Sequence, residues 1–147
     1  MTSFLSFISS AGTIFSKDLG VFALRIGTGS LFFYYGFEHL KKGKTEWKWM
    51  GSQLAPFGIT FTPTLWGFIA SSIQICGGLL CIIGLKMRLA SLLIACIMLV
   101  AIDIHKRKDI NNNAIALPIT LFIILISLTI SGSGRFSIDY LISKMWC

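Results

Sequence analysis

Four polar residues interrupt or closely follow strongly apolar segments of the chain: Arg25, Gln74, Ser137 and Asp139. Arg25 follows the start of its apolar run by six residues, and a charge in hydrocarbon costs at least about 2.5 kcal/mol. Helical side chains point toward the helix N-terminus, so Arg25 can extend to the side of the membrane on which Asp139 emerges. The sequence therefore predicts a hydrogen-bonded Arg25–Asp139 pair, with Gln74 as a second partner of Arg25.

Gln74 lies in the middle of the second apolar run and has two interpretations. It can form a hydrogen bond between two membrane helices, which contributes roughly 0.6–2 kcal/mol. It can also form the polar wall of a ligand cavity. We favour the bond between helices, because one uncharged polar side chain is a weak indication of a site.

A second polar cluster is expected at the other ends of the apolar runs: Glu38, His39, Asp103 and His105. Carboxylates and histidines there can form i,i+4 pairs at helix ends, as Asp103 does with Arg107. The same residue types can also relay protons or bind a metal ion. Because Asp103 and His105 point about 200° apart on a helix, they do not easily line one site. We favour helix-end pairs and expect no metal ligands.

The cysteines and histidines suggest no redox centre carried by the chain itself. Cys76 and Cys81 lie about 140° apart around a helix and cannot bond to each other. There is no CxxC motif, no flavin-binding motif and no haem-binding pair of histidines at bundle spacing. Any electrons would therefore come from a partner protein or from a bound quinone.

The elements that carry these residues are expected to be membrane helices. Of 147 residues, 54% are hydrophobic and only 13% are charged, which is too apolar for a soluble domain. Four apolar runs, 19–40, 64–85, 87–104 and 114–131, approach or reach the roughly 20 residues that a spanning helix needs. We predict an all-α membrane protein, with four transmembrane helices in one antiparallel bundle that forms a single domain over residues 1–147.

Short segments at the two ends complete this prediction. The first 18 residues are too polar to span and are expected to form a separate interfacial helix. Gly132 and Gly134 should end the fourth span in left-handed conformations. Ser137 should then cap a short amphipathic helix with the sequence SIDYLISKMW.

The net charge of +7 is distributed over several loops, without a nucleic-acid recognition motif. Membrane lipid head groups are the expected counterions, and nucleic acid is not an expected partner. The loop side carries Lys41, Lys42, Lys44, Lys48, Lys106, Arg107 and Lys108, and the termini side carries Lys17, Lys86, Arg88, Arg135 and Lys144. The larger basic set predicts cytoplasmic loops and external termini. Trp47, Trp49 and Trp66 are expected in an interfacial belt on the loop side.

Four segments resemble the DoxX family of small membrane proteins: LRIGTGSLFFYYGFEHL, GGLLCIIGLKMRLASLL, IDIHKRKD and GSGRFSIDYL. The resemblance extends from residue 19 to 141 and implies a four-helix membrane fold. The residues that match the family pattern are Arg25, Gly36, Gly77, Gly78, Gly84, Arg88, His105, Ser137 and Asp139. Gln74 departs from it, because the family usually has a glutamate there. The change removes a counter-charge for Arg25.

The resemblance also implies a function, since some DoxX proteins are similar to, or associate with, redox machinery such as thiosulfate:quinone oxidoreductase. We expect an accessory or quinone-interacting subunit of a membrane oxidoreductase, multi-pass in the bacterial inner (plasma) membrane, with a redox enzyme or a second copy as partner. One alternative is a protein that binds or carries a small amphiphile or lipid. Another is a non-catalytic assembly factor for other membrane proteins.

Overall fold

The computed structural model describes residues 2–107, 112–134 and 136–145, with side chains described from residue 17 to 107 and from residue 115 onward. These residues form six α-helices and one 3-10 turn, and no strand occurs among them. The all-α prediction is therefore confirmed. The elements are α1 (Thr2–Lys42), α2 (Lys44–Ser52), η1 (Ala55–Phe57), α3 (Pro63–Ile83), α4 (Met87–Arg107), α5 (Asn112–Ser131) and α6 (Ile138–Met145).

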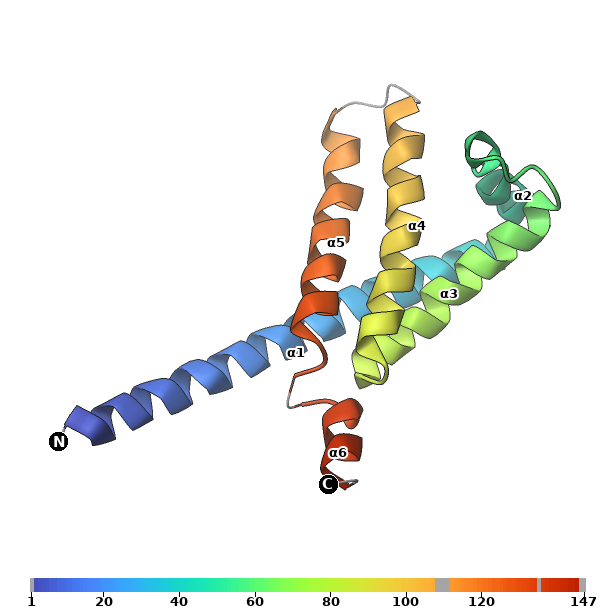
Figure 1. Cartoon of the computed structure of the whole chain (residues 1–147). Helices are drawn as coiled ribbons and strands as arrows, with labels where there is room; N and C mark the ends of the chain where they lie inside the picture. Colours follow the sequence, from blue (N-terminus) through green and yellow to red (C-terminus); the bar gives the residue numbers. More distant parts are fainter. Residues whose placement is uncertain (1, 108–111, 135, 146–147) are drawn as a thin grey trace.

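Two helices, α3 and α4, are long and apolar enough to cross a membrane. The apolar part of α5, Ile115–Ser131, is shorter. The four long helices α1, α3, α4 and α5 run alternately up and down (Figure 1). The α3–α4 connection is a tight turn in which Gly84 has a φ of 74° and caps α3, as a helix terminus prefers.

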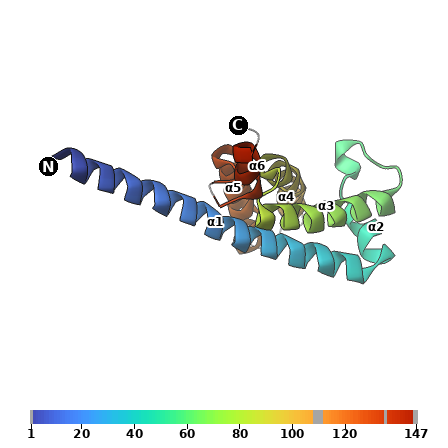
Figure 2. The same ribbon diagram turned by 90° about the horizontal axis from the view of Figure 1, so that it is seen from below.

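The first helix differs from the prediction. Instead of a separate interfacial helix, residues 2–42 form one continuous helix of 41 residues. The serines of this segment do not break a helix, no proline follows Lys17 and Asp18, and Gly20 does not adopt the left-handed conformation that would end one. The N-terminal part of α1 extends well beyond the other helices (Figures 1 and 2).

The long helices form two pairs rather than one compact bundle. α1 packs along α3, and we call this pair the first arm. α4 packs along α5, and we call this pair the second arm. The two arms diverge from the α3–α4 turn in the shape of a V (Figures 1 and 2). Glycines bring the helices of the first arm together: a Cβ on Gly29 would lie 2.7 Å from the Gly78 oxygen, and a Cβ on Gly78 would lie 2.7 Å from the Gly29 oxygen. Contact this close is made through the backbones, as small residues allow in membrane helices.

The segment between α1 and α3 folds back onto the first arm. α2 packs against the beginning of α3, where Gly67 touches the backbone of Trp47 and Gly51 touches the backbone of Pro63, with no room for a side chain on either glycine. The indole Nε1 of Trp47 donates to the His39 carbonyl over 3.0 Å. The region that the sequence indicated only as a loop therefore contains a helix, α2, that packs against α3.

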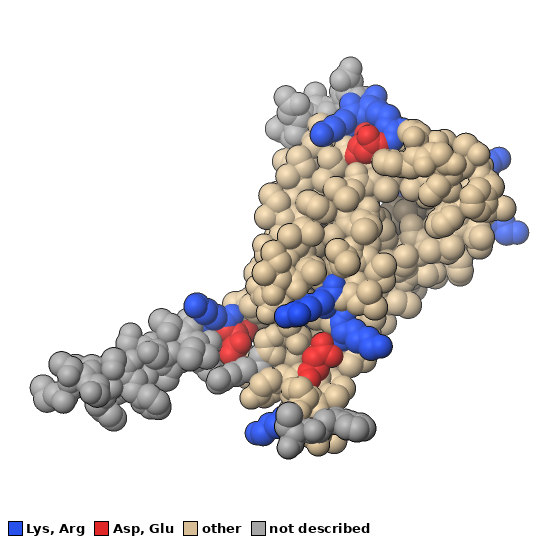
Figure 3. Space-filling view, in the orientation of Figure 1, with Lys and Arg blue, Asp and Glu red and all other residues tan. Residues whose placement is uncertain are grey.

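The buried core lies mainly between α3, α4 and α5 and reaches α1 through Phe32. Its members are Phe32, Cys81, Met87, Ala90, Ile94, Ala95, Met98, Leu121, Leu125 and Leu128. Large apolar side chains also face outward, such as Leu89, Ile123 and Ile130. Figure 3 shows charged side chains near the two ends of the second arm, with an uncharged surface between them. That distribution is typical of helices that face lipid.

Candidate functional site

Arg25 is almost completely buried and donates to four backbone carbonyls. Its Nε lies 3.1 Å from the Cys81 oxygen, and Nη2 lies 3.1 Å from the Ile82 oxygen. Its Nη1 lies 2.7 Å from the Ser133 oxygen and 2.9 Å from the Phe136 oxygen. Cys81 and Ile82 belong to the last turn of α3, whose carbonyls lack partners within the helix. Arg25 therefore caps α3 and fastens the α5–α6 connection to it.

Asp139 caps the N-terminus of α4, the helix that follows α3 in the chain. Its Oδ1 accepts from the Lys86 N–H over 3.0 Å, and Oδ2 accepts from the Met87 N–H over 3.3 Å. The Asp139 N–H in turn donates to the Gly84 oxygen over 3.2 Å. A carboxylate at the start of α4 satisfies free amides and opposes the positive end of the helix dipole.

The C-terminal turn forms as the sequence predicted. Gly132 and Gly134 have φ values of 74° and 67°, and Ser137 Oγ accepts from the Tyr140 N–H over 3.2 Å at the start of α6. We refer to Arg25, Ser137 and Asp139 together as the termini-side clamp.

The predicted hydrogen-bonded pair between Arg25 and Asp139 is wrong. Within the described part of the chain, each uses the backbone partners given above, and Asp139 acts on Arg25 only by Coulomb attraction. Gln74 is not a partner of Arg25 either. It packs beside Gly36, which is 11 residues, or about 16 Å, further along α1. The carbonyls at the end of α3 compete with the carboxylate for the guanidinium, which the residue types alone do not reveal.

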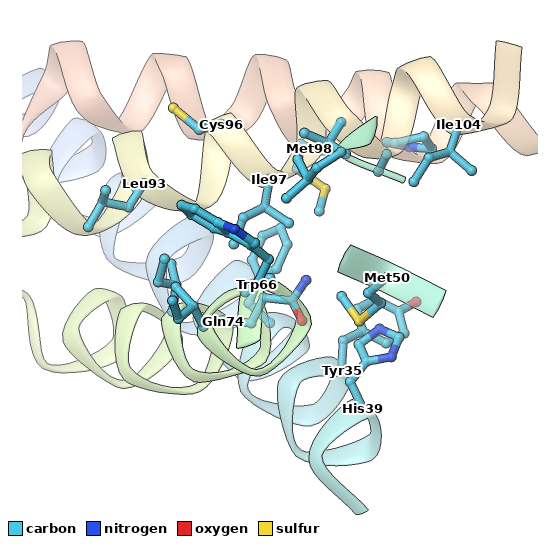
Figure 4. A pocket seen from close by; sticks show the side chains of 18 of the residues that line it. Tyr35, His39, Met50, Trp66, Gln74, Leu93, Cys96, Ile97, Met98 and Ile104 are labelled. Atoms are coloured by element: carbon cyan, nitrogen blue, oxygen red, sulfur yellow. The ribbon is translucent and has the colours of Figure 1, made fainter. Parts of the chain in front are cut away.

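A cavity of about 510 Å³ lies between the two arms of the V, on the side of α2; we call it the V cavity (Figure 4). Its wall is mostly apolar and is contributed by α1, α3, α4, α5 and the α2–η1 segment. The surface is visibly hollowed there (Figure 3). The polar and titratable side chains of the wall are Tyr35, His39, Trp49, Trp66, Gln74, Cys96 and His105. Small-molecule sites commonly have this size and this ratio of apolar to polar groups.

Two polar atoms beside the V cavity are buried without a partner. Gln74 is only 4% exposed, and neither its Oε1 nor the Trp66 Nε1 has a hydrogen-bond partner among the described residues. Each such atom costs roughly 1–3 kcal/mol. Figure 4 shows both side chains reaching from α3 toward Ile97 and Met98 of α4. Because the terminal torsion of glutamine is soft, the Gln74 amide can rotate to meet a ligand in the cavity.

Two histidines line the V cavity from opposite arms. His105 Nδ1 lies 2.7 Å from the Ala101 oxygen. A carbonyl can only accept, so Nδ1 carries the proton, and Nε2 of the neutral ring is left as an acceptor. His39 Nδ1 lies 3.3 Å from Glu46 Oε1, a carboxylate that the sequence analysis did not single out.

The structure divides the predicted loop-side cluster. His39 and His105 both line the V cavity, while Glu38 and Asp103 are not part of its described wall. Asp103 pairs with Arg107 one turn later, as predicted. Among the residues that the structure describes, no group of three or more His, Cys, Asp or Glu is arranged to hold a metal ion.

Sequence reasoning did not connect two tryptophans with the cavity. Trp49 and Trp66 were expected in an interfacial belt, and both line the cavity wall, with the Trp66 ring facing the cavity in Figure 4. One signal could have indicated this: Trp66 and Gln74 are eight residues apart, which places them about 80° apart on one side of a helix.

Comparison with known proteins identifies the family. The DoxX family model matches residues 20–107, a range that includes Arg25, His39, Trp66, Gln74 and His105. A Bacillus subtilis (strain 168) protein named "Putative oxidoreductase CatD" is 26% identical over 129 residues, which cover 88% of this chain and 91% of that protein. No solved structure matches the chain. The chain belongs to the DoxX family, whose membership together with two apolar helices points to a membrane protein.

Proposed function

We propose that this protein crosses the membrane four times and binds the head group of a membrane quinone in the V cavity, as an accessory subunit of a membrane oxidoreductase. The spans are α1, α3, α4 and α5, in the plasma membrane of a bacterium. The larger set of basic residues favours a cytoplasmic position for the α1–α3 and α4–α5 connections.

The observation that carries this proposal is the pair of unpartnered polar atoms beside an apolar cavity, Gln74 Oε1 and Trp66 Nε1. A buried polar group without a partner is rare in proteins and often marks a functional site. A quinone ring is flat and apolar and carries oxygens on opposite edges. Such a ring suits a cavity whose few polar groups lie on different turns of one helix.

The cavity is also continuous with the outer apolar surface. Ile69, Leu93 and Leu117 line it and are at the same time exposed, at 36%, 42% and 54%. A ring in the cavity can therefore extend an isoprenoid tail between the arms into lipid. This lateral opening favours a ligand that arrives from the membrane.

The residues of the wall can position a ring and exchange protons with it. Electrons would come from a partner protein, in keeping with an accessory role. The oxidoreductase name of the Bacillus subtilis relative supports this part of the proposal.

Fluorescence quenching by a short-tailed benzoquinone tests the proposal, because quinones quench indoles that they contact. The purified protein should show saturable quenching, and the double variant Trp49→Phe/Trp66→Phe should remove most of it, because both indoles line the cavity. Trp47→Phe is the matched control, since Trp47 is not among the wall residues. Quenching that never saturates, or that is unchanged in the double variant, would reject quinone binding in the cavity.

The lateral opening equally favours a second candidate, a carrier of another amphiphile with one polar end. Mass spectrometry of gently purified protein separates the two, because a carrier would retain a lipid or metabolite in place of quinone.

A further inference from the structure

We propose that the V cavity binds the reduced quinol form of the ring more tightly than the oxidised quinone. This inference rests on the proposed function and specifies the chemical form that the site prefers.

The argument begins with the hydrogen-bonding character of the two unpartnered atoms. Trp66 Nε1 is a donor only, and Gln74 Oε1 is an acceptor only. A quinone ring offers two carbonyl oxygens, both acceptors, so it can satisfy Trp66 but leaves Oε1 without a donor. A quinol oxygen both accepts and donates, so one quinol can satisfy both atoms.

Rotation of the glutamine amide does not remove this difference. If the Gln74 side chain turns its N–H toward a quinone oxygen, Oε1 is still buried without a donor. Most of the wall is apolar, and the nearby hydroxyl of Tyr35 does not donate to Oε1, which has no hydrogen-bond partner among the described residues.

The opposite wall adds a second acceptor. His105 uses Nδ1–H for the Ala101 carbonyl, so Nε2 of the neutral ring can only accept. His105 comes from the arm that faces Gln74, which places acceptors on both sides of the cavity. Both features favour a ligand that carries O–H groups.

The size of the expected preference follows from a single hydrogen bond. A buried acceptor that gains a neutral donor contributes about 1 ± 0.5 kcal/mol, which corresponds to roughly two- to tenfold in affinity. We expect the quinol to bind about fivefold more tightly than the quinone.

The test is competition against one labelled short-tailed quinone, under anaerobic conditions, with the unlabelled quinone and its quinol as competitors. The full-length purified protein should prefer the quinol by about fivefold. Gln74→Met, which keeps the length of the side chain but removes the acceptor, should lower the ratio severalfold while quinone affinity changes little. Gln74→Glu keeps an acceptor oxygen whether or not it is protonated, and should retain the preference.

Thr28→Val is the matched control. Thr28 is as buried as Gln74, but its hydroxyl already donates to the Leu24 carbonyl and it is not part of the described cavity wall. This variant should leave the ratio unchanged. A melting curve for each variant confirms that the protein is folded.

The outcomes separate this inference from the function on which it rests. If neither form displaces the label and the label itself does not saturate, quinone binding is rejected and the inference with it. If both forms bind with a ratio of one or below, the cavity binds quinone but the preference is overturned. A preference that is undiminished in Gln74→Met also overturns the inference, because the acceptor would then not be Gln74.

Discussion

Arg25 and Asp139 hold the two sides of the α3–α4 turn without bonding to each other: the guanidinium binds carbonyls that end α3, and the carboxylate binds amides that begin α4. Each charge has the sign that the adjoining helix end favours. Because Arg25 belongs to α1 and Asp139 to α6, the first and the last helix are both fastened to this turn. The vertex of the V is therefore tied by hydrogen bonds, while the V cavity lies between the diverging arms.

Arg25→Lys should destabilise the protein by about 2–4 kcal/mol. A lysine ammonium has three donors at one point, and it cannot reach the carbonyls of α3 and of the α5–α6 connection together. The buried carbonyls would be left without partners. Denaturant unfolding in detergent micelles measures the loss.

Arg88→Lys serves as the control for that substitution, because Arg88 is exposed and its change should lie within about 0.5 kcal/mol. An equally small effect for Arg25→Lys would contradict the role of Arg25 as a cap of α3.

Asp139→Ala should cost about 1–2 kcal/mol, the usual loss for an N-terminal cap. Combined with Arg25→Leu, the two losses should show a coupling of less than about 1 kcal/mol, since the residues share no hydrogen bond and interact only through space. A double-mutant cycle of melting temperatures and unfolding free energies measures the coupling. Recovery of stability in the double variant would mean that the two charges do form a direct pair.

Gln74→Met should stabilise the ligand-free protein by about 1–3 kcal/mol, because it removes a buried acceptor that has no partner among the described residues. A site that costs stability for the sake of binding shows this signature. The same substitution at Gln53, whose amide donates to Trp49 and Ser52 at the surface, should change stability by less than about 0.5 kcal/mol. Destabilisation by Gln74→Met would show that its amide is satisfied within the protein.

Membrane orientation can be tested at two exposed lysines, Lys48 and Lys144. In a background without native cysteines, Lys144→Cys should react with an impermeant maleimide in intact cells. Lys48→Cys should react only after the cells are permeabilised, because the basic loop side is expected in the cytoplasm. The reverse pattern of labelling would invert the assigned orientation.

The parts of the fold that depend on local sequence could be predicted. Gly132, Gly134 and Ser137 end one helix and begin another by backbone conformation and capping, and these effects act within a few residues. The α3–α4 turn at Gly84 was predictable for the same reason. The continuous α1 was missed because polar residues near position 18 resemble a helix start, although nothing there ends the preceding helix.

The V and its cavity could not be predicted from one sequence. The arm formed by α1 and α3 depends on how Gly29 and Gly78 bring two helices together, and these residues are far apart in the chain. The partners of Arg25 were missed for a similar reason: backbone carbonyls are present in every helix, so a pairing of charged side chains is the more visible pattern. Gln74 was the one residue for which the sequence suggested the polar wall of a ligand cavity, and we had favoured a hydrogen bond between helices instead.

The central claim is that the V cavity holds a quinone, and the quinone content of protein purified gently from its own membrane tests it most directly. Ala70 lines the cavity, and Ala70→Phe should fill part of it, whereas Ala23 is exposed on α1 and Ala23→Phe should not. Quantitative mass spectrometry should find quinone bound to the wild-type protein and to Ala23→Phe, and strongly reduced in Ala70→Phe. Equal amounts of quinone in all three proteins, or none in the wild type, would contradict this account.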